Sequence, residues 1–470
     1  MKKDLFINYF QTIQSTTRGQ NYSKITRYFF PEFITAIALY SIPLLIDARF
    51  IAHLKSTTTY ATLGVTNTLL HFIIKIAEGF SVGTIILAGQ QNGIKNFRQT
   101  GNVLINAFWT TVIFGLLISA FLFFGASYIY YWYNVPAEMI TMGVPFLKLR
   151  AISVFFTFIY FACIGFLRGI KNTRVPMYIF IAGSALFLLS DYLLIFGKWG
   201  FPELGLQGSA VASIVQYSTM CFIACVYLFL SKEIKPYTVS LLTYCAQWKN
   251  VKRLLAISWP IMVDKGTLAG AYLWLGKCLA PMGTSVLASF AVIKDLERFA
   301  LLPAIAFAQV VTFLVSNACG KQDWDGIKIT IKRIVLLSSL MVLSILFLCS
   351  LCPAKIIQFF DKQGDFTTFA AAAFPIISVF ALFDVLQIIL AGGLRGSANV
   401  KTVMITRLTI CLGFFIPVSY FLSSLDMTNQ MLKFVLIYSS LYLGNALMSI
   451  LYIRRFKGKD WKKQAVRNSE

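Results

Sequence analysis

The sequence predicts an all-α membrane protein with twelve transmembrane helices, arranged as two six-helix bundles. Two observations predict the helices: the composition is 57% hydrophobic and only 13% charged, and apolar blocks recur along the whole chain. A soluble domain carries about 25% charged residues, and a helix needs about 20 apolar residues to cross a bilayer. A third observation, a motif repeated half a chain apart, predicts the division into two related bundles.

Twelve apolar blocks are the predicted spans. Lipid offers the backbone no hydrogen-bond partners, so blocks this uniformly apolar are expected to be helices. Lys148 and Arg150 stand near the start of the fourth block, which makes it the least regular. The blocks are 29–50, 62–90, 102–125, 141–167, 176–197, 205–230, 254–277, 286–318, 334–352, 369–394, 403–422 and 431–453.

The net charge of +23 is distributed unevenly, because Lys and Arg concentrate in alternate loops. By the positive-inside rule, this asymmetry predicts a multi-pass protein of the cytoplasmic (inner) membrane with both termini in the cytoplasm. Topology thus accounts for the charge, and no nucleic-acid partner is expected. The predicted parts are a cytoplasmic N-terminal segment (1–28), a first bundle (29–230), a cytoplasmic linker (231–253), a second bundle (254–453) and a basic tail (454–470) that can touch anionic lipids.

The repeated motif reads "IGFLRGIKNTRVPM" near residue 164 and "AGGLRGSANVKTVM" near residue 391. Arg168 and Arg395 within it lie 227 residues apart. Pro31 and Pro260 lie 229 residues apart, which requires only a two-residue gap in the first outside loop. Six spans followed by six spans in the same orientation indicate an internal repeat about an axis along the membrane normal.

Each copy of the motif stands where a helix is expected to enter a short cytoplasmic loop. Gly169 and Gly396 permit a tight turn there, and Arg168 and Arg395 complement the helix dipole and the anionic leaflet. We therefore interpret these four residues, together with Pro31 and Pro260, as loop and topology motifs.

Several segments resemble multidrug and toxic compound extrusion (MATE) transporters. "GFLRGIKNTRVPMY", "SDYLLIFG" and "GFPELGLQGSAVASIVQ" resemble the first half of that family, and "LASFAVIKDLERFALLPAIAFAQ" and "ALFDVLQIILAGGLRGSANVKT" resemble the second half. Their order and spacing carry the resemblance, which runs from Pro31 to Arg407. It implies a V-shaped pair of bundles around a central cavity, and alternating access coupled to inward flow of H⁺ or Na⁺.

Asp47 in the first span and Asp191 in the fifth are the predicted ion-coupling residues. A carboxylate inside a span is costly unless it is paired, protonated or facing a cavity. Counted along the helices, both acids lie in the outer half of the bilayer, and both resemble the family's ion-linked acids. Many relatives have Asn where this chain has Phe187, which removes a sodium ligand and favours protons. The alternative is that either Asp only accepts hydrogen bonds from neighbouring helices.

The second bundle holds further candidate acids. Asp384 and Gln387 share a helix face, and Asp384 resembles an acid that some family branches carry in the tenth span. Glu297 resembles the acid of the DinF-like branch, and Asp264 lies in the seventh span. Basic residues stand close to these acids in the sequence, so the alternative is a structural salt-bridge network.

The sequence therefore predicts a secondary active efflux transporter, and not an enzyme. The expected partners are membrane lipids and a hydrophobic or cationic small molecule, exported by a monomer in exchange for H⁺ or, less favoured, Na⁺. A flippase for lipids or lipid-linked oligosaccharides, from the same superfamily, remains an alternative. An integral-membrane transferase is a more distant one, because the short loops supply no His cluster.

No cofactor is expected beyond the coupling ion. The two His and nine Cys show no metal-ligand spacing. A phosphate-binding loop of the kind that would indicate ATP-driven pumping is also missing from the sequence.

Overall fold

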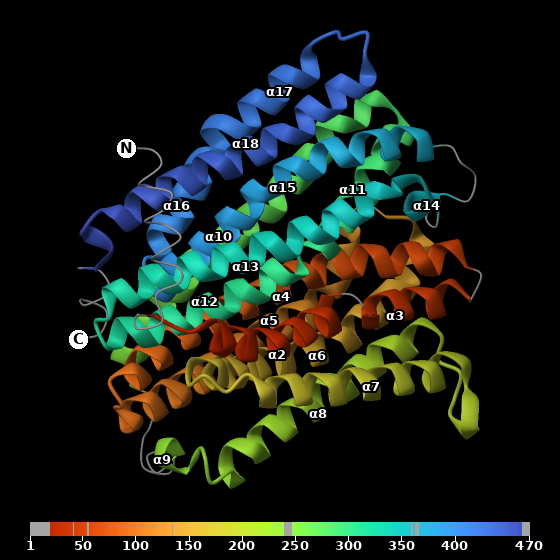
Figure 1. Ribbon diagram of the computed structural model, residues 1–470. Helices are drawn as coiled ribbons and strands as arrows, with labels where there is room; N and C mark the ends of the chain where they lie inside the picture. The colour runs from red at the N-terminus through yellow and green to blue at the C-terminus, as the bar shows by residue number, and fades with distance from the viewer. Residues whose placement is uncertain are drawn as a thin grey trace, which may run out of the picture. The chain divides into compact units, whose positions relative to one another are not determined.

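The computed structural model describes residues 19–40, 42–53, 56–133, 135–238, 247–358, 361 and 366–462. These residues form long helices joined by short loops, and none of them is in a strand (Figure 1). The predicted N-terminal segment, linker and tail lie partly outside the described residues.

The first half of the chain folds into a series of long helices. Residue 41 lies outside the described residues, so the predicted span 29–50 is described as two helical stretches. The elements are α2 (Tyr22–Tyr40), α3 (Ile42–Ala52), α4 (Thr57–Gly93), α5 (Phe97–Trp132), α6 (Ala137–Gly169), α7 (Arg174–Phe196), η1 (Lys198–Gly200), α8 (Leu206–Leu230) and the short α9 (Lys235–Thr238).

The second half repeats this pattern. A π-helical turn, η3 (Cys411–Phe415), joins two of its helices into one span. The elements are α10 (Trp248–Leu279), η2 (Ala280–Met282), α11 (Thr284–Ala300), α12 (Leu302–Gly320), α13 (Trp324–Leu351), α14 (Pro353–Gln358), α15 (Thr367–Gly396), α16 (Val400–Ile410), α17 (Ile416–Ser424) and α18 (Gln430–Lys457).

One predicted span differs from the structure. The block 286–318 is not a single helix, because α11 ends at Ala300 and α12 begins at Leu302. Pro303 stands in the first turn of α12 and cannot donate the backbone hydrogen bond that would continue α11. Its counterpart in the first half, α4, runs unbroken from Thr57 to Gly93.

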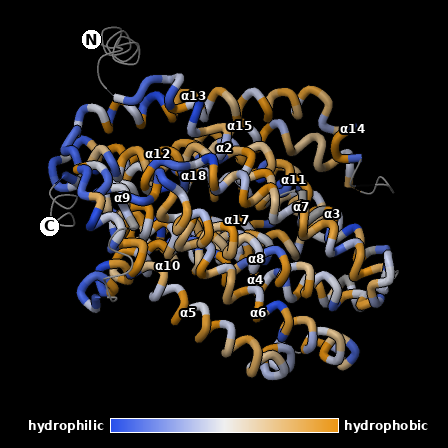
Figure 2. The backbone as a smooth tube through the Cα atoms, turned by 90° about the horizontal axis from the view of Figure 1, so that it is seen from below, coloured by the Kyte–Doolittle hydropathy of each residue, from blue (hydrophilic) through white to orange (hydrophobic). Residues whose placement is uncertain are grey.

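Ten of the described helical segments are long and apolar enough to cross a membrane. In the apolar stretches of α4 and α12, 78% of the residues are buried, whereas in those of α5 and α13 the buried share is 17% and 22%. The first pair therefore lies in the core of its bundle, and the second pair presents apolar side chains outward. Hydrophobic residues cover most of each helix, and hydrophilic residues gather toward the helix ends (Figure 2).

The described residues divide into two compact units. The first unit is Ile34–Met262, and the second is Met1–Phe33 together with Val263–Glu470. The borders fall within α2 and α10, each directly after the second residue that follows Pro31 or Pro260, and both prolines lie inside these helices. Each unit thus contains the start of a helix whose remainder belongs to the other unit.

Contacts within the second unit show why the start of α2 belongs to it. The ring of Phe29 stacks on that of Phe307 in α12, with ring centroids 4.0 Å apart, and Tyr28 meets Phe313 edge to face. Such aromatic pairs stabilise packing beyond the burial of their area.

The internal repeat is visible in the turns. Lys95 and Lys171 have positive φ angles of 61° and 68°, and the residues 227 positions later, Gln322 and Ala398, have φ angles of 57° and 60°. A non-glycine residue in this region is uncommon, so two matched pairs at one offset indicate the same turn geometry in both halves.

Helix caps follow the same offset. The side chain of Asn96 accepts a hydrogen bond from the backbone N–H of Gln99 at the start of α5. Asp323, 227 positions later, accepts one from Gly326 at the start of α13. Each cap satisfies a backbone donor that has no partner inside its own helix.

The glycines of the repeated motif lie in the last turns of α6 and α15, and the turn itself follows two residues later, where Lys171 and Ala398 have positive φ angles. Their contribution in the structure is close packing. A Cβ on Gly169 would lie 2.8 Å from Cβ of Ala88 in α4, and one on Gly396 would lie 2.5 Å from the backbone oxygen of Thr312 in α12.

Each copy also has a second packed glycine, Gly165 or Gly392, one turn earlier. The repeated motif is therefore a small-residue helix contact of the kind that lets membrane helices approach closely.

This packing makes a testable prediction. Gly396→Ala should lower the melting temperature, because α15 must move away from the Thr312 carbonyl, and overpacking costs about 1–3 kcal/mol. Gly270→Ala is the matched control in the same unit, because its Cβ meets no atom within 4 Å. Heating followed by size exclusion of the detergent-solubilised protein measures both variants. Equal melting temperatures would show that the contact is dispensable.

Candidate functional site

A cavity of about 90 Å³ lies inside the first unit. Residues from α2, α3, α4, α6, α7 and α8 line it, so every long helix of this unit except α5 and α10 contributes. Such a volume holds several water molecules. Its polar lining consists of Asp47, Asn67, His71, Lys75, Arg150, Ser153, Thr157, Ser213, Gln216 and Tyr217.

Asp47, a predicted ion-coupling residue, is on α3 and lines this cavity. Its side chain is only 2% exposed and accepts a hydrogen bond of 2.7 Å from the hydroxyl of Ser209, in the first turn of α8. A single neutral donor leaves most of the acceptor capacity of a carboxylate unused.

Asp191, the second predicted ion-coupling residue, lies on α7 and is 0% exposed. Neither of its carboxylate oxygens has a hydrogen-bond partner in the described part of the chain. It lies close enough to Asp47 for the two charges to interact. An ionised carboxylate without a partner is costly to bury, so this arrangement suits a group that binds a proton or a cation.

Sequence reasoning missed Arg150 as a member of this site. Its guanidinium donates to Oδ1 of Asn67 at 3.1 Å and to the hydroxyl of Ser213, and it interacts electrostatically with both acids. Its position inside a predicted span could have identified it, but there it was interpreted only as making the fourth apolar block less regular. A charged residue within a span is a functional candidate by default.

The second unit contains a different charge cluster. Asp264 on α10 forms ion pairs with Arg395 at the end of α15 and with Arg407 on α16. Asp264 and Arg407 are 1% and 2% exposed. The arginine of the repeated motif thus has a buried acid as its partner in this half. Arg168, its counterpart, is also buried, in the last turn of α6.

The remaining candidates of the second unit lie around α18. Asn445 donates to Asp384 at 3.2 Å, and the hydroxyl of Tyr438 donates to Glu297. Gln387 lies one turn after Asp384 on α15 and is also buried. Asp384 interacts electrostatically with both Glu297 and Arg407.

The structure therefore brings Asp264, Asp384 and Glu297 into one buried network, with Arg407 as the cation between the first two. Sequence reasoning missed the roles of Arg407, Asn445 and Tyr438 in this network. No sequence spacing links α16 and α18 to α10 and α15, so these partners depended on the tertiary fold.

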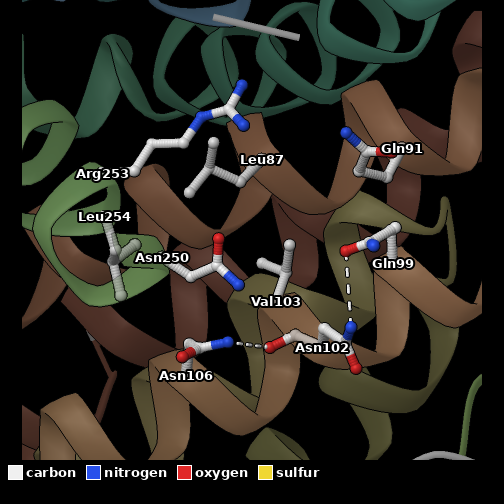
Figure 3. A pocket seen from close by; sticks show the side chains of 9 residues that line it. All are labelled: Leu87, Gln91, Gln99, Asn102, Val103, Asn106, Asn250, Arg253 and Leu254. Atoms are coloured by element: carbon white, nitrogen blue, oxygen red, sulfur yellow. Dashed lines mark hydrogen bonds between the residues drawn. The ribbon is translucent and has the colours of Figure 1, made fainter. Parts of the chain in front are cut away.

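A second, smaller cavity lies among the ends of α4, α5 and α10 in the first unit and has a volume of about 40 Å³. Amide side chains surround it, and Asn102 donates to Gln99 while Asn106 donates to the backbone oxygen of Asn102 (Figure 3). Arg253 lines the same cavity. Its size suits a few water molecules, and amides are good partners for water.

The Asp264 cluster makes a stability prediction. Asp264→Asn should lower the melting temperature strongly, because it removes the carboxylate that forms ion pairs with two arginines, and breaking a buried pair costs about 3–5 kcal/mol. Asp384→Asn is the matched control, because the partner of this carboxyl among the described residues is the neutral amide of Asn445. Thermal unfolding in detergent compares the two. A smaller loss for Asp264→Asn than for Asp384→Asn would contradict the structural role of the cluster.

Solved transporters share this fold. An outward-facing multidrug resistance MATE family transporter of the MOP superfamily aligns with a TM-score of 0.83 and 16% identity, over 95% of this chain and 96% of that chain. A MOP superfamily transporter from Pyrococcus furiosus, described as having a binding pocket of reverse polarity, aligns with a TM-score of 0.85 and 15% identity, over 98% of both chains.

Curated proteins match at the level of sequence. The chain is 21% identical to the probable multidrug resistance protein NorM of Thermotoga maritima, over 90% of each protein. It is 23% identical to the multidrug resistance protein NorM of Photobacterium profundum, over 79% of this chain and 81% of that protein. The MatE family model matches twice, at residues 33–193 and 260–421, once in each half of the chain. The chain therefore belongs to the MatE family.

Proposed function

We propose that this protein is a secondary active transporter that exports hydrophobic or cationic small molecules in exchange for H⁺. Membership in the MatE family and the similarity to proteins named for multidrug resistance support the substrate class. The observation that carries the coupling is the pair Asp47 and Asp191. These two buried acids are close enough to interact, and the second has no hydrogen-bond partner among the described residues.

The acid pair supplies a simple cycle. Protonation from outside removes negative charge from the first unit and lowers the cost of the buried pair, which lets the helices around the cavity rearrange and release substrate outward. Deprotonation toward the inside restores the charge and the affinity for a cationic substrate. Each turn of this alternating-access cycle moves the proton down its gradient and the substrate out.

Protons are favoured over sodium by the residues around the pair. Phe187, one turn before Asp191, lines the cavity with a hydrocarbon ring that offers a cation no oxygen ligand. A sodium ion needs several oxygen ligands, whereas a proton needs one carboxylate. In this proposal the chain acts as a monomer in the inner membrane, with both termini in the cytoplasm and lipids against outward-facing helices such as α5 and α13.

The coupling proposal predicts the behaviour of three variants. Asp47→Asn, Asp191→Asn and the double variant should all lose H⁺-driven dye efflux to a similar extent, because groups that act as a unit are not additive. Efflux from proteoliposomes under an imposed pH or Na⁺ gradient is the measurement. Asp295→Asn, which changes an exposed carboxyl on α11, is the control and should keep wild-type efflux. Full pH-driven efflux by Asp47→Asn, or wild-type efflux driven only by Na⁺, would refute the coupling.

The proposed topology predicts where Cys352 reacts. This cysteine is exposed between α13 and α14, on the side assigned to the outside. With the other eight of the nine cysteines replaced, an impermeant maleimide should label Cys352 on intact cells. A single cysteine at Lys321, which is exposed on the opposite side, should react only after permeabilisation. The reverse labelling pattern would show that the protein has the opposite orientation in the membrane.

A further inference from the structure

Arg150 lies in the same cavity as the proposed ion-coupling acid Asp47, and nothing in the proposed function requires it there. It comes from α6, where its guanidinium carbon lies 5.7 Å from the ring centroid of Phe146. That contact and its hydrogen bonds to Asn67 and Ser213 fix the guanidinium inside the unit. A guanidinium keeps its proton at every accessible pH, so this positive charge is constant while the acids titrate.

Arg150 occupies oxygens that a metal cation would need. Oδ1 of Asn67 and the hydroxyl oxygen of Ser213 are acceptors for the guanidinium, so they are engaged. Sodium is a hard cation that binds through such oxygens, and it would have to displace these bonds. It would also have to enter a cavity that already contains a fixed positive charge, which repels it.

Arg150 also connects to Asp47 through the start of α8. The hydroxyl of Ser213 donates to the backbone oxygen of Ser209 at 3.0 Å, and the hydroxyl of Ser209 donates to Asp47 at 2.7 Å. The guanidinium therefore supports the helical turn that supplies a hydrogen bond to Asp47. A change at Arg150 reaches the acid both through its charge and through this turn.

The cavity also receives charged and titratable side chains from α4 and α8. From α4 the cavity receives His71 and Lys75, and Lys75 pairs with Glu78 at 2.9 Å on its own helix. From α8 it receives the phenol of Tyr217. Arg150 is the cation that interacts electrostatically with both acids in this part of the chain.

We infer that Arg150 is the built-in cation of this cavity and selects the coupling ion: it excludes Na⁺ and leaves Asp47 and Asp191 to exchange protons only. The inference rests on the proposed function of the acid pair and adds the residue that determines its ion specificity. Arg150 is a positioning residue in this account, because it acts on the coupling ion through the two acids and the oxygens around them.

The experiment compares four proteins in proteoliposomes and in detergent: wild type, Arg150→Gln, Arg150→Lys and Lys148→Gln. Lys148 is the matched control, because it is a cation two residues away on α6 that lies over the ring of Phe123 and does not line the cavity. The readouts are the pH dependence of dye efflux, efflux under a Na⁺ gradient, and the melting temperature in NaCl against choline chloride at equal ionic strength.

Wild type and Lys148→Gln should not respond to Na⁺ in efflux or in melting temperature. Arg150→Gln should gain a Na⁺-dependent rise in melting temperature, and the midpoint of its pH profile should move upward by about one pH unit, because the acids lose their neighbouring cation. Arg150→Lys keeps the charge and should stay insensitive to Na⁺. The comparison of melting temperatures in NaCl and choline chloride tests for Na⁺ binding even if Arg150→Gln no longer transports.

A further variant covers the case in which Arg150→Gln does not fold. Arg150→His should respond to Na⁺ at pH 8, where its imidazole is neutral, and lose the response at pH 5, where it is charged. Na⁺-insensitive Arg150→Gln or Arg150→His with the wild-type pH midpoint would overturn the inference and leave the proposed function intact. A wild type driven by Na⁺ would also overturn it. A wild type that exports nothing under either gradient would instead overturn the proposed function.

Discussion

The cost of holding a charge away from water is the constraint on which the two units depend. In the second unit the constraint is met by direct pairing, since Asp264 forms ion pairs with both Arg395 and Arg407 inside the bundle. In the first unit it is met only partly, because Asp191 has no hydrogen-bond partner among the described residues and Asp47 has one hydroxyl. Ion pairing holds a buried acid in one charge state and favours one structure, whereas an acid without an ion-pair partner can change its protonation state and the structure with it.

The internal repeat gives the acid pair of the first unit and the ion-paired cluster of the second unit the same helical framework. The two halves share matched turns at Lys171 and Ala398 and matched glycine contacts on α6 and α15. The side chains on that frame differ, because Asp384 corresponds to Thr157 and Arg407 corresponds to Phe180 at the offset of 227 residues. The two halves therefore share these helix contacts and differ in their buried charged residues.

Local pattern predicted the fold class well because a span needs only composition and length, and a repeat needs only spacing. The same reasoning missed the break between α11 and α12, where the apolar block continues across Pro303. It placed Asp47 and Asp191 as a pair from their depth, and the structure brings them together. It did not place Arg150 with them, because the depth of a residue along its helix does not say which way the side chain points or which helix lies opposite.

The sequence by itself determined the helical membrane class, the two related halves and the acids that carry the candidate chemistry, because apolar length, repeat spacing and intramembrane charge are all properties of the chain. Only the tertiary structure decided the partners of those acids. Asp264 pairs with arginines 131 and 143 residues away, and Asp47 takes its hydrogen bond from Ser209, 162 residues away. Such contacts arise from how helices pack against one another, and the pairing of two particular polar side chains from distant helices leaves no fixed spacing in the sequence.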